Sequence, residues 1–163
     1  MADKTQTDGM ARAVRRFMEE LPFSKALQME MEEMGDGHAV ISMPYSEALV
    51  GDPATGVIHG GAVSALMDTC GGAAVMSHPA AKSATATLDL RIDYMRPASP
   101  GDRITARAHC YHVTRSVAFI RAEAFDADME RPVAAATGAF TVAGATDIKD
   151  VADAAQSKDA AGG

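Results

Sequence analysis

The sequence predicts an α+β domain in which one antiparallel sheet wraps around a single long helix. Residues 60–77 are almost wholly apolar, with Asp68 as the only charged side chain, which is typical of a buried helix. Segments before and after this stretch alternate between apolar and polar residues, and a period of two is typical of strands. We therefore expect the helix to pack on one face of the sheet.

The 163 residues are expected to form one domain. Residues 1–9 are polar and lack periodicity, so we expect a disordered N-terminus. Residues 144–163 are rich in alanine, aspartate, lysine and glycine without a core pattern, and we expect a flexible C-terminal tail. The single domain is then expected to span residues 10–143.

The first half of the domain is expected to contain a helix, a hairpin and a loop. Residues 10–20 are predicted to form a short helix that Pro22 ends. Residues 27–32 alternate as a strand, and residues 38–43 are predicted to be the return strand of a hairpin. The loop 45–58 then leads into the long helix.

The second half is expected to supply four more strands. Alternation predicts strands over residues 85–94, 103–110, 117–124 and 133–142. Their apolar faces are rich in alanine, and such small side chains would let a helix lie close to the sheet.

The start of the long helix carries a pair of glycines, Gly60 and Gly61. Glycines let another group come close to the backbone, and the helix start has free N–H groups at the positive end of the helix dipole. Gly60 and Asp68 are eight residues apart, or about 12 Å along one helix. One carbonyl cannot lie about 3 Å from both groups. Two copies of the chain could bring them together and would then form two equal sites.

Composition excludes several classes of protein. A formal net charge of −7 argues against a nucleic-acid binder. The sequence contains no apolar run long enough to span a membrane and no signal peptide, so we expect a cytoplasmic protein without membrane association. Cys70 and Cys110 are isolated, which favours buried, reduced thiols over a disulfide. No histidine spacing indicates a metal site, and His109 and His112 are expected on opposite faces of a strand.

Two motifs together resemble the PaaI-type hotdog-fold acyl-CoA thioesterases. The first is His-Gly-Gly-Ala at 59–62 with Leu66 and Asp68 following, and the second is the strand 87–97, which ends in Tyr-Met-Arg-Pro. The resemblance covers roughly residues 49–142. It implies the hotdog fold, an antiparallel sheet wrapped around a long central helix, with sites between paired subunits.

The resemblance implies roles for four residues. Asp68 would be the nucleophile or the general base that activates water, whereas the residues alone equally allow a carboxylate that only holds a loop. The Gly60 N–H would be the oxyanion donor. His59 would help to position the thioester or its loop, and the helix dipole predicts that it is neutral. Thr87 would support the acid or its water, although the strand pattern puts it on the polar face, where surface threonines are common.

Substrate-binding residues are also implied. The family often has asparagine before the glycine pair, and Asp52 occupies the nearest place; since an ionised aspartate cannot donate a hydrogen bond, a structural cap is the default interpretation. Gly61 would adjoin the substrate or serve only the turn. The phosphates of CoA call for polar and basic groups. The candidates are Lys82, Arg91, Arg96, Arg115 and Ser116.

The function implied is hydrolysis of a small acyl-CoA, with an aryl or short- to medium-chain acyl group, to the free acid and CoA. No cofactor is expected, because CoA enters as part of the substrate. The chain is expected to pair with itself as a homodimer or as a homotetramer that is a dimer of dimers. A hotdog enoyl-CoA hydratase or dehydratase and a non-catalytic acyl-CoA-binding protein are the alternatives, although the dehydratase His-Phe-Pro signature is missing.

Overall fold

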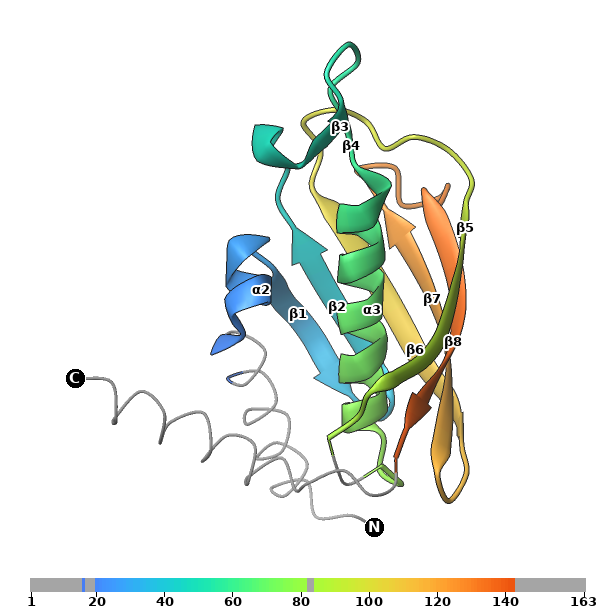
Figure 1. Ribbon diagram of the computed structural model, residues 1–163. Coiled ribbons are helices and arrows are strands. Elements are labelled where there is room, and N and C mark those ends of the chain that lie inside the picture. Colours follow the sequence, from blue (N-terminus) through green and yellow to red (C-terminus); the bar gives the residue numbers. More distant parts are fainter. Residues whose placement is uncertain (1–15, 17–19, 82–83, 143–163) are drawn as a thin grey trace, which may run out of the picture.

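A computed structural model describes residues 16, 20–81 and 84–142 (Figure 1). The expectations for residues 1–9 and 144–163, for most of the helix 10–20 and for Lys82 lie outside these residues. In the described part, no helix is long and apolar enough to cross a membrane.

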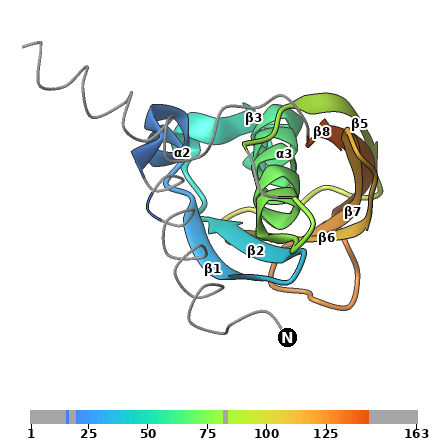
Figure 2. The same ribbon diagram turned by 90° about the horizontal axis from the view of Figure 1, so that it is seen from below.

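A six-stranded antiparallel sheet curves around the long helix α3 (Gly60–Ser77), as Figures 1 and 2 show. The strands lie in the order β1-β2-β6-β7-β8-β5. Their bounds are β1 Glu30–Gly35, β2 His38–Met43, β5 Thr87–Tyr94, β6 Ile104–Val113, β7 Val117–Phe125 and β8 Ala134–Thr141. The predicted architecture is confirmed, and the bounds of α3 and β2 match the residues predicted for them.

Small side chains on the inner face of the sheet let α3 lie close to it. Buried alanines recur on β6, β7 and β8, as the alternation predicted. Gly71 of α3 faces the ring of Phe140, where an added Cβ would lie 3.0 Å from Cζ. The nearest neighbour of this glycine is therefore an aromatic side chain of β8.

The chain before the hairpin differs from the prediction. Pro22 begins a short helix, α2 (Pro22–Ala26), because proline is well suited to the first turn of a helix. Gln28 then adopts a left-handed conformation with φ of 52°, so β1 begins only at Glu30. Leu27, Met29 and Met31 are nevertheless all buried, as expected.

The loop predicted over residues 45–58 contains short regular elements. These are the 3₁₀-helix η1 (Glu47–Leu49) and the strands β3 (Val50–Asp52) and β4 (Val57–Ile58), which pair with each other. A turn between the two strands brings the chain back to the start of α3.

Two β-bulges overturn predictions that relied on simple alternation. In β5 the register with β8 shifts between Thr87 and Asp89, which turns Thr87 toward the helix and leaves Leu88 58% exposed. In β6 the register with β7 shifts between Cys110 and His112. Since this shift adds one residue, His109 and His112 share the outer face of the sheet instead of lying on opposite faces.

A buried ion pair joins the β5–β6 and β7–β8 connections. The two terminal nitrogens of Arg96 each donate to one carboxylate oxygen of Asp126, at 2.7 Å. The Asp126 side chain is only 1% exposed and also accepts from the N–H groups of Ser99 and Asp128. Arg96, followed by these N–H groups, holds the pKa of Asp126 well below its usual value despite burial.

Replacing Asp126 by asparagine should lower the free energy of unfolding at pH 7 by about 3 kcal/mol, because the variant leaves a charged guanidinium without its partner. Urea unfolding measures the difference. The pKa of Asp126 is depressed by folding, so the ion pair contributes fully above about pH 4 and is lost as the pH falls below it. The difference between wild type and variant should therefore shrink in acid.

Asp128→Asn is the matched control, because its ion pair with Arg131 is exposed and should contribute little. An Asp126→Asn variant as stable as wild type at pH 7 would contradict this assignment.

Candidate functional site

The first turn of α3 leaves one backbone donor open. His59 precedes the helix and accepts a hydrogen bond from the Gly61 N–H through its side-chain Nδ1, at 2.8 Å. Its carbonyl accepts from the Ala62 N–H at 2.9 Å. Of the first three N–H groups of α3, only that of Gly60 has no partner among the described residues. The open end of the helix dipole is therefore the Gly60 N–H.

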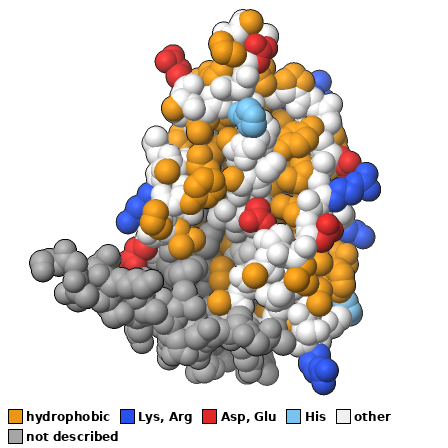
Figure 3. Space-filling view, viewed as in Figure 1, with side chains coloured by type: hydrophobic (Ala, Val, Ile, Leu, Met, Phe, Trp, Pro, Cys, Tyr) orange, Lys and Arg blue, Asp and Glu red, His pale blue; other side chains and the backbone are white. Residues whose placement is uncertain are grey.

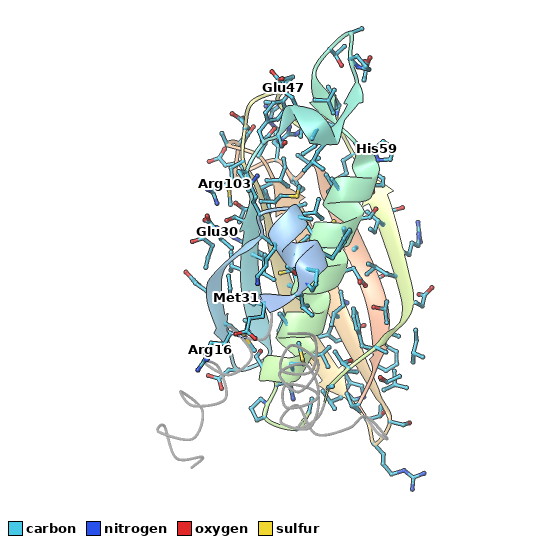
Figure 4. All side chains as sticks on the ribbon, turned by 60° about the vertical axis from the view of Figure 1, so that its left-hand side comes forward. Arg16, Glu30, Met31, Glu47, His59 and Arg103 are labelled. Carbon is cyan, nitrogen blue, oxygen red and sulfur yellow. The ribbon has the colours of Figure 1, made fainter. Side chains whose placement is uncertain are left out.

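The hydrogen bond to Nδ1 also sets the state of His59. A nitrogen that accepts a hydrogen bond carries no proton, so Nε2 carries it and the ring is neutral. Figure 4 shows His59 at the beginning of α3. The imidazole acts as the N-cap of the helix, and Gly61 has no free N–H for a substrate.

Side chains lie close against both glycines. A Cβ on Gly61 would lie 2.8 Å from Nδ1 of His59, and a Cβ on Gly60 would lie 3.3 Å from Cζ of Tyr94. A Cβ on Gly51 of β3 would lie 2.8 Å from the Cα of His59. The close approach predicted for the glycine pair is therefore made by His59 and Tyr94.

Asp68 lies two turns further along α3 and is partly buried. Its Oδ1 accepts a hydrogen bond of 2.7 Å from the hydroxyl of Thr87, which the bulge in β5 turns toward the helix. Its Oδ2 has no hydrogen-bond partner among the described residues. Thr87 therefore orients the carboxylate and leaves one oxygen able to accept a proton or a water hydrogen.

The partly exposed stripe of α3 consists mostly of small residues. It contains Gly61, Ser64, Ala65, Asp68, Thr69 and Gly72. Hydrophobic side chains gather on both sides of the helix on this face of the molecule (Figure 3). Within one chain the Gly60 and Asp68 positions are about 12 Å apart, so one chain does not bring them to a common carbonyl.

Two cavities flank the first turn of α3. One, of about 380 Å³, lies between Gly60, Tyr94 and the apolar side chains Val57, Val63 and Met95. The other, of about 400 Å³, lies on the opposite side of the turn, beside Gly61, and is lined by apolar residues of α2 and η1. A third hollow, of about 460 Å³, lies on the outer face of the sheet and contains none of the site residues.

Asp52 holds its own turn together. Its Oδ2 accepts from the Thr55 hydroxyl at 2.7 Å and its Oδ1 from the Ala54 N–H at 3.0 Å. These bonds, that from Thr55 first, lower the pKa of Asp52. The side chain is an ionised acceptor engaged in a turn cap, in line with the default interpretation of this position.

The residues considered for binding the phosphates of CoA do not lie together. Arg96 is committed to Asp126 and to the Arg131 carbonyl, and its Nε is buried, so the phosphate-binding role considered for it does not fit this geometry. Arg91 is exposed and pairs with Asp93 on the outer face of the sheet. Arg115 and Ser116 lie in the exposed β6–β7 turn, at the end of the domain where α3 ends (Figure 1).

Other chemistries find little support in the described residues. Cys70 and Cys110 are buried and free, and burial raises the pKa of Cys70 to about 12, which makes it a poor nucleophile. No group of three potential metal ligands occurs in the part of the chain that the structure describes.

Sequence reasoning missed Tyr94 and Ser64. The Tyr94 hydroxyl donates to the Gly60 carbonyl at 2.7 Å and lies 2.5 Å from Oγ of Ser64. The available signal was a tyrosine on the helix-facing side of its strand, since a phenol in such a place usually finds a hydrogen-bond partner.

Comparisons with known proteins show which proteins this chain resembles. The family model "Thioesterase superfamily" matches residues 55–133. The medium/long-chain acyl-CoA thioesterase YigI of Salmonella typhimurium is 29% identical over 139 residues, which are 77% of this chain and 88% of that protein. YigI of Escherichia coli matches with the same identity and coverage.

Solved structures are also similar. A Pseudomonas aeruginosa protein is 38% identical, with a TM-score of 0.72 over 81% of this chain and 98% of its own. The E. coli PaaI protein, from the phenylacetic acid degradation operon, is 25% identical, with a TM-score of 0.75 over 85% of this chain and 96% of its own. On the motif, the fold and these similarities, the chain belongs to the PaaI-type hotdog-fold family of thioester hydrolases.

Proposed function

We propose that this protein hydrolyses acyl-CoA thioesters with a small aryl or a short- to medium-chain acyl group to the free acid and CoA. The observation that carries the proposal is the pair of groups on α3, the open Gly60 N–H and the Asp68 carboxylate with one free oxygen. The YigI relatives, named as medium/long-chain acyl-CoA thioesterases, support the same chemistry.

The Gly60 N–H is suited to the developing oxyanion. The thioester carbonyl accepts its hydrogen bond, and the positive end of the helix dipole stabilises the negative charge as the carbonyl carbon becomes tetrahedral. Because no described residue bonds to this N–H, it is available without rearrangement.

Asp68 is suited to activate the attacking group. As general base it takes a proton from water, the resulting hydroxide adds to the carbonyl, and collapse expels the CoA thiolate, which receives the proton from Asp68. As nucleophile the carboxylate itself adds and expels the thiolate, and water then cleaves the mixed anhydride to the free acid and Asp68. Thr87 holds Oδ1 in either case and leaves Oδ2 to react.

The site is proposed to form between two subunits, because the two groups are about 12 Å apart on one rigid helix. Strand β5 is an edge of the sheet and exposes Leu88 and Met95 beside it. Pairing of two chains along β5 would lay one α3 beside the other, so a homodimer is the minimal assembly, and a dimer of dimers keeps the same site.

Several features suit an acyl-CoA substrate. The cavities beside Gly60 and Gly61 are apolar and of a size for a small acyl group. Arg91, Arg115 and Ser116 remain the candidates for the CoA phosphates, since their side chains are exposed. No cofactor is needed for either route. Unpaired thiols at Cys70 and Cys110 suit a reducing, cytoplasmic location.

The direct test measures thiol release from a panel of aryl and straight-chain acyl-CoAs with wild type and Asp68→Asn. We expect wild-type turnover and a loss of about 10²–10⁴ in kcat for the variant, since the amide cannot accept the proton. Asp36→Asn, in the β1–β2 turn, is the control and should match wild type, because asparagine also tolerates the left-handed conformation of this residue.

Tight binding of CoA thioesters by the wild type without turnover would instead support a non-catalytic acyl-CoA-binding protein. Hydration of an enoyl-CoA without thiol release would support a hydratase.

A second test addresses the support of the carboxylate. Thr87→Val keeps the shape of the side chain but deletes the hydrogen bond to Asp68, and we expect kcat to fall about tenfold. Thr87→Ser keeps the hydroxyl and should stay close to wild type. Steady-state assays on one good substrate compare the three proteins, and equal kcat values for all three would show that the hydrogen bond has no part in turnover.

A further inference from the structure

The Tyr94 hydroxyl links β5 to the first turn of α3. It donates to the Gly60 carbonyl at 2.7 Å and accepts from the hydroxyl of Ser64 at 2.5 Å. Tyr94 itself is 50% exposed, so burial of the residue alone does not force its hydroxyl to find a backbone partner. Its position on the Gly60 carbonyl therefore calls for another explanation.

The peptide group that Tyr94 holds is also held from its other side. The Gly60 carbonyl and the Gly61 N–H belong to the same peptide group, and the Gly61 N–H donates to Nδ1 of His59 at 2.8 Å. One side chain thus binds the oxygen of this peptide and another binds its hydrogen. A rotation of the peptide plane would break both hydrogen bonds.

These two hydrogen bonds restrain a helix start that is prone to move. Two successive glycines have more backbone freedom than any other pair, and a helix end tends to fray. The direction of the Gly60 N–H depends on whether residue 60 keeps its helical conformation. Donors that stabilise an oxyanion are effective because they are fixed in place before the reaction.

The hydrogen bonds from β5 to α3 fit the same positioning role. Two β5 side chains donate hydrogen bonds to α3 in the described residues. Thr87 donates to the Asp68 carboxylate, and Tyr94 donates to the carbonyl of Gly60, the residue whose N–H is proposed to act. Gly60 in turn allows the phenol to approach, because a Cβ there would lie 3.3 to 3.4 Å from the Tyr94 ring and hydroxyl.

We propose that Tyr94 is a positioning residue, which together with His59 fixes the Gly60–Gly61 peptide and so keeps the Gly60 N–H aimed at the thioester oxygen. This inference rests on the proposed thioesterase function, and it assigns to Tyr94 no contact with the reacting atoms. The hydroxyl acts through the backbone of Gly60.

The test is Tyr94→Phe, which keeps the ring against Gly60 and deletes only the hydroxyl. We expect kcat to fall about tenfold while KM stays within about twofold, because an oxyanion donor acts mainly on the transition state. Amide hydrogen exchange at Gly61, followed by NMR, should become faster because the peptide loses one of the two side chains that hold it. Tyr45→Phe is the matched control, since it also deletes a hydroxyl bonded to a glycine carbonyl, that of Gly56, away from this peptide.

Three outcomes would overturn the proposal while wild-type turnover and its dependence on Asp68 still stood. They are an unchanged kcat, an unchanged exchange rate at Gly61, or a rise in KM that accounts for the whole loss. If Tyr94→Phe unfolds, Ser64→Ala tests the proposal instead, because it removes the donor to the phenol and leaves Tyr94 in place. That variant should lower kcat by a smaller factor, and an unchanged kcat would again overturn the proposal.

Discussion

A straight α-helix holds its residues at fixed separations, and this constraint governs the site. The open N–H of Gly60 and the carboxylate of Asp68 lie about 12 Å apart on α3, and neither can move toward the other. Leu66 and Met67 between them are fully buried, so the helix cannot bend without disrupting the core. A reaction that uses both groups on one carbonyl therefore needs a second helix, and the free edge strand β5 beside α3 is where the sheet can supply one.

Much of the fold could be predicted because buried positions recur in the sequence with the period of a strand or a helix. The inner faces of β7 and β8, and of β6 up to Cys110, follow the alternation, and α3 coincides with the apolar stretch in which Asp68 is the only charged residue. The wrong predictions occur where the periodicity of the sequence carries no information. A bulge inserts one residue without changing composition, so the faces of Thr87 and His112 depended on hydrogen-bond register. Pro22 is equally suited to follow a helix or to begin one.

The site was predictable where chemistry depends on residue type and spacing, and less so where it depends on partners. A lone carboxylate in an apolar helix and a glycine pair at its start are visible in the sequence. In the structure, one oxygen of the carboxylate and the N–H of the first glycine have no hydrogen-bond partner among the described residues. The sequence does not distinguish Arg96 from any other basic residue, because its partner Asp126 is 30 positions away. Tyr94 is 34 positions from Gly60 in sequence, and only the fold brings its hydroxyl to the peptide.

The measurement that tests the shared site most directly is complementation between two inactive chains. Gly60→Pro removes the N–H yet suits the first helical position, and His59 already has the extended ψ of 133° that precedes proline. Gly60→Ala, which keeps the N–H, controls for the added bulk beside Tyr94. The Gly60→Pro and Asp68→Asn chains should each be inactive alone. A purified hybrid of the two should regain about half the wild-type activity, since one of its two sites is intact. A hybrid that assembles but stays inactive would mean that the two groups do not act across subunits.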